Sequence, residues 1–146
     1  MRDASTGLLN RVENTLVRRP DIGLLLLRWV VGGHPVVMTW DNVVSWDRML
    51  EFRDFLAHHG FAFPLACAVL SVAGQLVGGL LLAIGAWTRP AALVVAFNFM
   101  VALWMVDARA PYPAAFPALA LVAGAMCLAF TGAGRLSVDA RLRERL

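Results

Sequence analysis

The chain has 146 residues, of which 60% are hydrophobic and only 16% are charged. Soluble domains are about half apolar, so this composition excludes an ordinary soluble domain and indicates a membrane protein. The net charge of +3 does not indicate nucleic-acid binding, because the arginines are scattered over the tails and loops and form no basic stripe with interleaved aromatic residues.

The N-terminal 21 residues are not typical of a removable signal peptide, since they lack an apolar core followed by a small-residue cleavage site. Apolar residues recur there at helical spacing between charged ones, namely Leu8, Leu9, Val12, Leu16 and Val17. This pattern predicts an amphipathic helix at the membrane surface.

Four apolar stretches follow, each close to the roughly 20 residues that cross a bilayer as a helix. The sequence predicts one all-α membrane domain over residues 1–146, a bundle of four transmembrane helices. The predicted spans are residues 22–44, 61–87, 90–106 and 110–134, with tails at 1–21 and 135–146.

The connections between the spans differ in kind. Between Asp41 and Gly60, aromatic and aliphatic residues alternate with charged ones, which predicts a short interfacial helix between the first two spans. Only Thr88 and Arg89 separate the second and third predicted spans, so we expect a tight turn there and an antiparallel hairpin.

Arginine placement predicts the orientation, because basic residues near span ends favour the cytoplasm. Four spans put both tails and Arg89 on one side with nine arginines, and leave three on the other side. We therefore expect an inner (plasma) membrane protein with both termini in the cytoplasm.

Several polar side chains fall inside the predicted spans. At about 1.5 Å of rise per residue, Arg28, Gln75 and Asn98 lie near the bilayer midplane, and His34 lies about a turn and a half farther out. A charged arginine there costs roughly 2.5 to 3.5 kcal/mol, so it should face the bundle and find acceptors, with Gln75 and Asn98 as candidates. Two interpretations stay open. In the first, these residues form a binding pocket. In the second, Arg28 extends toward the lipid headgroups, and Gln75 and Asn98 only form hydrogen bonds between helices.

Gly74 and Gly78 form a GxxxG motif that Gly79 extends, which predicts close helix packing within the chain or between copies in a homo-oligomer. A metal site is not predicted, because the adjacent His58 and His59 point apart on a helix and no third ligand is evident. Phosphate-binding loops and the motifs of dinucleotide enzymes, zinc proteases and serine hydrolases are also absent, so the sequence does not predict an enzyme that acts alone.

Three segments resemble the DoxX family. They are LLLLRWVVG at 24–32, the stretch 70–105 with GQLVGGLLLAIGAWTRPAALVVAFNFMVALWM, and GAGRLSVDARL at 132–142. By this resemblance Arg28, Gln75, Gly78, Gly79, Thr88 and Arg89 occupy the family's motif positions. Relatives often carry glutamate where this chain has Gln75, and a frequent His-Gly near the position of Met38 is not matched.

The resemblance implies a four-helix membrane protein associated with oxidoreductase complexes, with quinone as the candidate cofactor and oxidoreductase subunits as candidate partners. On that reading, Arg28 and the two amides donate hydrogen bonds to quinone carbonyls. The alternatives are a carrier or channel-like protein for a small molecule, in which polar groups also lie at mid-depth, and a purely structural membrane subunit.

Overall fold

The computed structural model of the chain describes residues 19–106, 108 and 110–145. Every regular element in these residues is a helix, and four of the helices are long and apolar enough to cross a membrane. The predicted all-α bundle of four membrane-spanning helices is confirmed. The predicted amphipathic segment at residues 1–21 falls mostly on residues 1–18, which lie outside the described residues.

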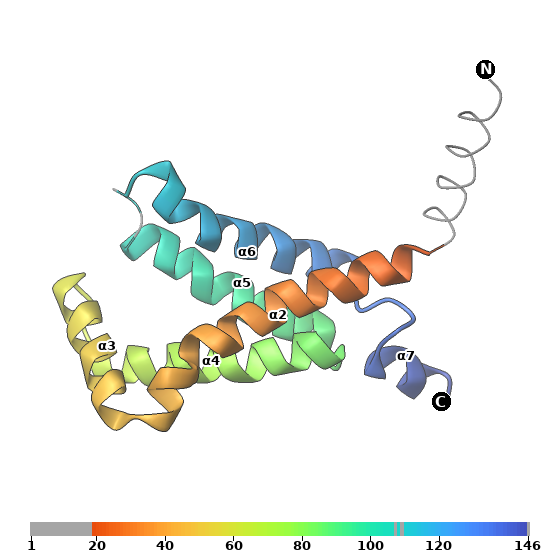
Figure 1. The fold of residues 1–146 in the computed structure, drawn as a ribbon, viewed down its shortest axis with the longest axis horizontal. Coiled ribbons are helices and arrows are strands. Elements are labelled where there is room, and N and C mark those ends of the chain that lie inside the picture. The colour runs from red at the N-terminus through yellow and green to blue at the C-terminus, as the bar shows by residue number, and fades with distance from the viewer. Residues whose placement is uncertain (1–18, 107, 109, 146) are drawn as a thin grey trace, which may run out of the picture.

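The helices pack as two pairs that share a central contact. Figure 1 shows α2 beside α4 and α5 beside α6, and α4 and α5 join the pairs. The short α3 lies at one end of the bundle, whereas α7 lies at the other end, near the start of α2. The helix bounds are α2 Pro20–Val44, α3 Trp46–His58, α4 Pro64–Ile84, α5 Thr88–Met105, α6 Tyr112–Thr131 and α7 Val138–Arg143.

Glycines bring the backbones of α2 and α4 into direct contact. A Cβ added at Gly32 of α2 would lie 2.5 Å from the carbonyl oxygen of Gly79, and a Cβ at Gly79 would lie 2.5 Å from the carbonyl oxygen of Gly32. Gly78 lies on another face of α4, where a Cβ would meet Val95 of α5 at 2.9 Å, and Gly74 lies near Val94. The glycines of α4 thus pack this helix against both α2 and α5.

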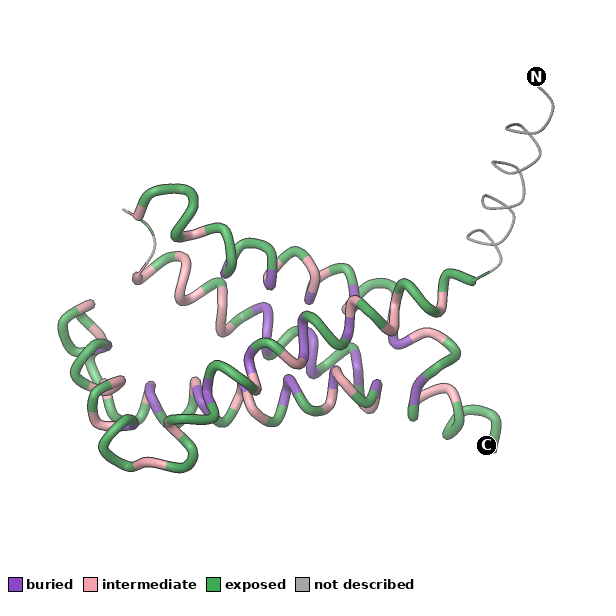
Figure 2. The backbone as a smooth tube through the Cα atoms, viewed as in Figure 1, coloured by how far each residue is buried: buried purple, intermediate pink, exposed green. Residues whose placement is uncertain are grey.

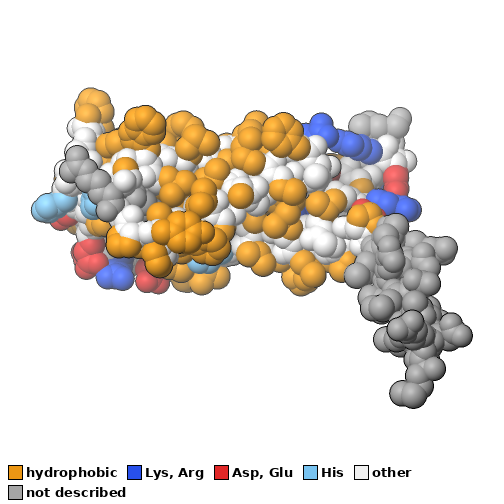
Figure 3. Space-filling view, turned by 90° about the horizontal axis from the view of Figure 1, so that it is seen from above, with side chains coloured by type: hydrophobic (Ala, Val, Ile, Leu, Met, Phe, Trp, Pro, Cys, Tyr) orange, Lys and Arg blue, Asp and Glu red, His pale blue; other side chains and the backbone are white. Residues whose placement is uncertain are grey.

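Burial is confined to the faces that the helices turn toward one another (Figure 2). The main core is built of small and aliphatic residues, among them Val31, Leu82, Val95, Ala125 and Leu128. Large apolar side chains cover the outside of every candidate span, and charged side chains gather at the two ends (Figure 3). A soluble monomer rarely exposes such a continuous apolar surface, so these faces contact lipid.

A helix, α3, occupies the connection in which the sequence predicts one. It begins after Ser45, whose Oγ accepts a hydrogen bond from the Arg48 backbone N–H at 3.4 Å. Its buried residues Met49 and Leu56 pack with Ala68 of α4. The apolar face of α3 therefore lies on the end of α4, while its charged face is exposed.

The turn between α4 and α5 is Gly85–Trp87, three residues before the predicted one. Gly85 has φ +72°, and the backbone N–H of Ala86 donates to the Leu81 carbonyl at 2.9 Å. This left-handed glycine ends α4, so Thr88 and Arg89 belong to the first turn of α5. The predicted antiparallel hairpin is present, but its turn is formed by residues other than the predicted Thr88 and Arg89.

Candidate functional site

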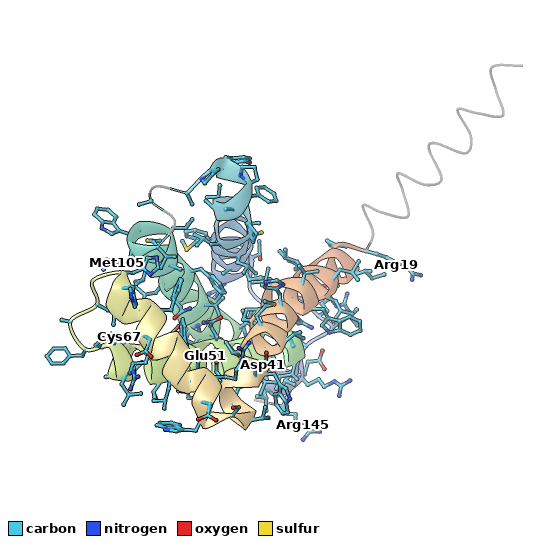
Figure 4. All side chains as sticks on the ribbon, turned by 60° about the vertical axis from the view of Figure 1, so that its left-hand side comes forward. Arg19, Asp41, Glu51, Cys67, Met105 and Arg145 are labelled. Carbon is cyan, nitrogen blue, oxygen red and sulfur yellow. The ribbon has the colours of Figure 1, made fainter. Side chains whose placement is uncertain are left out.

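A pocket of about 500 Å³ lies between α3, α4 and α5. Its walls are mostly aromatic and aliphatic, with Phe52 and Phe55 from α3, Phe61 from the next loop, and Phe97 and Phe99 from α5. Figure 4 looks onto this end of the bundle, with α3 in front and the labelled Cys67, another lining residue, close to it. Such a volume and lining are typical of sites for small apolar ligands.

Three polar side chains line this otherwise apolar pocket, namely Gln75, Ser71 and Asn98. Gln75 is only 9% exposed, and its Nε2 donates to the Ser71 Oγ at 3.1 Å, one helical turn earlier. Within the described residues, the Asn98 amide makes no hydrogen bond to protein, and neither does the Gln75 carbonyl oxygen. Both carboxamides therefore keep hydrogen-bonding capacity for a ligand in the pocket.

The pocket borders the lipid-facing surface of the bundle. Leu70 and Phe97, which line it from α4 and α5, are 72% and 69% exposed. Because these side chains face outward from membrane-spanning helices, a lipid-soluble molecule reaches the pocket laterally from the bilayer.

Arg28 does not join the two amides. Its side chain is 1% exposed, and its Nη1 and Nη2 donate to the backbone carbonyls of Ala133 at 2.6 Å and Leu136 at 2.7 Å. It therefore faces the bundle as predicted, but its acceptors belong to the segment after α6, and the expected pairing with Gln75 and Asn98 is wrong. The long side chain runs toward the end of the bundle, where free backbone carbonyls accept hydrogen bonds from both Nη atoms. The buried Nε has no hydrogen-bond partner among the described residues.

His34 also lies apart from the pocket, because its side chain is exposed on α2 and does not line the cavity. Of the four residues of the predicted midplane cluster, Gln75 and Asn98 line one pocket. Arg28 and His34 lie at two other positions. Among the described residues, no three His, Cys, Asp or Glu side chains are grouped as metal ligands.

The segment 132–139 folds back onto the bundle, where the carboxylates of Asp139 and Asp21 hold it through hydrogen bonds with backbone N–H groups. Asp139 accepts hydrogen bonds from the backbone N–H groups of Trp87 at 2.8 Å and Thr88 at 3.0 Å, which caps the N-terminus of α5. Asp21 accepts one from the Arg135 backbone N–H at 2.7 Å. The guanidinium of Arg28 lies at the centre of this arrangement, directly against Gly85.

Asp139 makes the stability of this end depend on pH. Burial by itself raises the pKa of its carboxyl, but the hydrogen bonds from Thr88 and Trp87 and the charge of Arg143 outweigh burial and lower the pKa below its usual value. A carboxyl with a lowered pKa stabilises the fold fully above its unfolded pKa of about 3.9, and this contribution is lost as the pH falls through the folded pKa.

We therefore expect Asp139→Asn to lower the unfolding temperature in detergent at pH 7, and the difference from the wild type to shrink at about pH 3. The control is Asp47→Asn, an exposed carboxylate in the first turn of α3 that accepts no hydrogen bond from a distant segment of the described chain, so its substitution should have a much smaller effect. An Asp139→Asn variant as stable as the wild type at pH 7 would contradict the capping role.

The sequence of this chain matches a known protein family. The family model that matches is DoxX, over residues 23–108. The chain belongs to the DoxX family. Comparison with curated proteins and with solved structures finds no match.

The DoxX match covers nearly all of α2 and the whole of α3, α4 and α5, and so includes Arg28, Gln75 and Asn98. The family resemblance noted at 132–142 lies beyond the matched residues. In this DoxX protein the acceptors of Arg28 are found in that segment, so a residue inside the match is held by residues outside it.

Sequence reasoning missed two parts of these sites. The sequence predicts an interfacial helix between the first two spans but not that its Phe52 and Phe55 line a pocket. The second part is Asp139, which caps α5 from 51 residues farther along the chain, and no sequence pattern marks that contact. The sequence does carry a local signal for the N-cap of α7, because Ser137 accepts a hydrogen bond from the Ala140 N–H at 3.1 Å.

Proposed function

We propose that this DoxX protein is a quinone-associated accessory subunit of a membrane oxidoreductase complex, and that quinone binds in the pocket between α3, α4 and α5. The observation that carries the proposal is the lipid-bordering aromatic pocket with two carboxamides whose hydrogen-bonding capacity is not used up within the protein. A bound quinone supplies the complex with a lipid-soluble electron acceptor.

The pocket residues match the chemistry of a quinone. The amide N–H groups of Asn98 and Gln75 donate hydrogen bonds to ring carbonyls, because carboxamides carry two donors each. Phenylalanines stack on or against a flat ring, and the exposed Leu70 and Phe97 border the lipid from which an isoprenoid tail extends. Arg28, which lies elsewhere, is not part of this binding site.

The test is the quinone content of the full-length protein purified in mild detergent. Gln75→Leu and Asn98→Leu should each lower quinone retention by about two- to tenfold, which is the loss of one hydrogen bond worth about 1 kcal/mol. Asn42→Leu, near the C-terminus of α2 at a residue that does not line the pocket, is the matched control and should retain quinone as the wild type does. Wild-type protein without quinone, or equal retention in all variants, would contradict the proposal.

The proposed orientation has both termini in the cytoplasm. Five described arginines support it, because Arg141 and Arg143 belong to α7, Arg145 follows it, and Arg89 and Arg135 line the pocket beside it. At the other end, Arg48 and Arg53 of α3 each pair with a carboxylate. The C-terminal tail should then be cleaved by protease in inverted vesicles and protected in right-side-out ones.

A further inference from the structure

A second pocket, of about 370 Å³, lies at the end of the bundle that holds α7. It forms where the segment after α6 crosses the start of α5. Its walls carry three arginines, Arg89, Arg135 and Arg143, and two carboxylates, Asp21 and Asp139. The volume corresponds to roughly a dozen water molecules at about 30 Å³ each, so a phosphate group with its ester substituents has room.

The two carboxylates of this pocket are already engaged by backbone. Asp21 accepts from the Arg135 backbone N–H, and Asp139 accepts from the N–H groups of Trp87 and Thr88. Across the part of the chain that the structure describes, every ion pair within 4.0 Å involves Arg48 or Arg53. Those residues lie on α3 at the opposite end, where Figure 4 labels Glu51 and Asp41.

The three guanidinium groups of the pocket therefore make no ion pair with a described carboxylate. Arg89, Arg135 and Arg143 all have exposed side chains. Each guanidinium offers five N–H donors in a planar fork that fits the oxygens of a phosphate. The two carboxylates keep their charge, so three arginines against two carboxylates leave the pocket with a net charge of +1 (3 − 2). Three exposed guanidinium groups around one concavity provide the donors for an anion with several oxygens.

The depth of the pocket indicates where this anion comes from. Arg89 lies in the first turn of α5 and Thr131 is the last residue of α6, so the pocket lies at the level at which two membrane spans end. Phospholipid phosphates lie at this level. Exposed apolar side chains stand beside the pocket in the chain, Trp87 before Arg89 and Phe130 before Thr131, and they provide a surface for acyl chains.

We propose that this pocket binds the phosphate group of an anionic phospholipid through Arg89, Arg135 and Arg143. The proposal does not depend on the quinone pocket, which lies near the other end of the bundle. It assigns the arginine-rich C-terminal segment a binding role in addition to its effect on membrane orientation.

The test measures lipid binding to the delipidated full-length protein in detergent by native mass spectrometry. Phosphatidylglycerol should bind at least about tenfold more tightly than phosphatidylcholine with the same acyl chains. The double variant Arg135→Gln/Arg143→Gln should weaken phosphatidylglycerol binding about 25-fold, from about fivefold for each arginine. Arg89→Gln alone should weaken it about fivefold.

The matched control is Arg141→Gln/Arg145→Gln, which removes the same charge from the same segment but at residues that do not line the pocket. It should leave phosphatidylglycerol binding within about twofold of the wild type. Equal losses in the two double variants would overturn the proposal, because the charge of the tail alone would then explain binding.

Inorganic phosphate separates the two sources of a phosphate group. Binding of phosphatidylglycerol that excess inorganic phosphate only weakly reduces supports the lipid. If inorganic phosphate binds in a manner that requires Arg135 and Arg143, while the two lipids bind equally, the occupant is a soluble anion and the lipid assignment is overturned.

Discussion

Gly32→Ala is expected to destabilise the bundle by about 3 kcal/mol, whereas Gly33→Ala, one residue later on the same helix, should be neutral or slightly stabilising. A Cβ at Gly32 would lie 2.5 Å from the Gly79 carbonyl oxygen and 2.8 Å from the Ala83 backbone nitrogen, while a Cβ at Gly33 meets nothing within 4 Å. Overpacking costs about 1 to 3 kcal/mol, and the upper value applies here because backbone atoms cannot rotate away.

The measurement is the unfolding temperature of the purified variants in one detergent. Gly79→Ala should behave as Gly32→Ala does, since it introduces the reciprocal clash with the Gly32 carbonyl oxygen. Gly33→Ala isolates the intrinsic preference of helices for alanine over glycine, worth roughly 0.5 to 1 kcal/mol. Equal unfolding temperatures for Gly32→Ala and Gly33→Ala would show that α2 and α4 do not cross at this point.

Arg28→Met is expected to release the C-terminal segment from the bundle. The change leaves the carbonyls of Ala133 and Leu136 without their donors. The loss at the buried Ala133 carbonyl costs about 1 to 3 kcal/mol, and the loss at the part-buried Leu136 carbonyl costs less because water can replace the donor. Arg28→Lys should restore only part of the stability, because one ammonium group cannot reproduce the planar fork that reaches both carbonyls.

Limited proteolysis in detergent detects this release. Trypsin should cleave after Arg135 at least about tenfold faster in Arg28→Met than in the wild type, where the Arg135 backbone N–H is bonded to Asp21. The control is Arg48→Met, which removes exposed ion pairs with Asp41 and Glu51 that contribute little. Unchanged cleavage in Arg28→Met would contradict the structural role of this arginine.

Arg28 variants also separate the two ends of the molecule. Because Arg28 does not line the pocket that holds Gln75 and Asn98, the proposed quinone site predicts that any folded Arg28 variant retains as much quinone as the wild type. The midplane cluster inferred from the sequence makes the opposite prediction, since it places all three residues around one ligand. Measuring quinone in Arg28→Lys and in Gln75→Leu together therefore distinguishes the two arrangements.

Much of the architecture follows from the sequence alone, because a bilayer restricts the alternatives. Four apolar stretches of sufficient length must become helices in lipid, where every backbone group needs an internal partner. A charged and aromatic connection between the first two spans is expected to leave the hydrocarbon, and α3 lies at one end of the bundle (Figure 1). Length, hydropathy and helical periodicity were enough for these conclusions.

The sequence also predicts how deep each residue lies along its helix. Equal depth does not mean that two side chains contact each other. Arg28, Gln75 and Asn98 come from three different helices, and their spacing says nothing about the rotation of each helix around its axis. The structure turns Gln75 and Asn98 toward a shared pocket and directs Arg28 to the end of the bundle. A flexible arginine side chain reaches over more than one helical turn, so its position in the sequence does not determine its acceptors.

Tertiary structure alone decided the partners of Arg28, because they are backbone carbonyls 105 and 108 residues farther along the chain. Every residue has a carbonyl, so no side-chain pattern marks the two that become acceptors. The same holds for the aromatic wall of the pocket, since an amphipathic helix such as α3 shows an apolar face without showing what covers it. The sequence by itself determined which segments enter the membrane, and the packing of those segments determined which polar groups meet there.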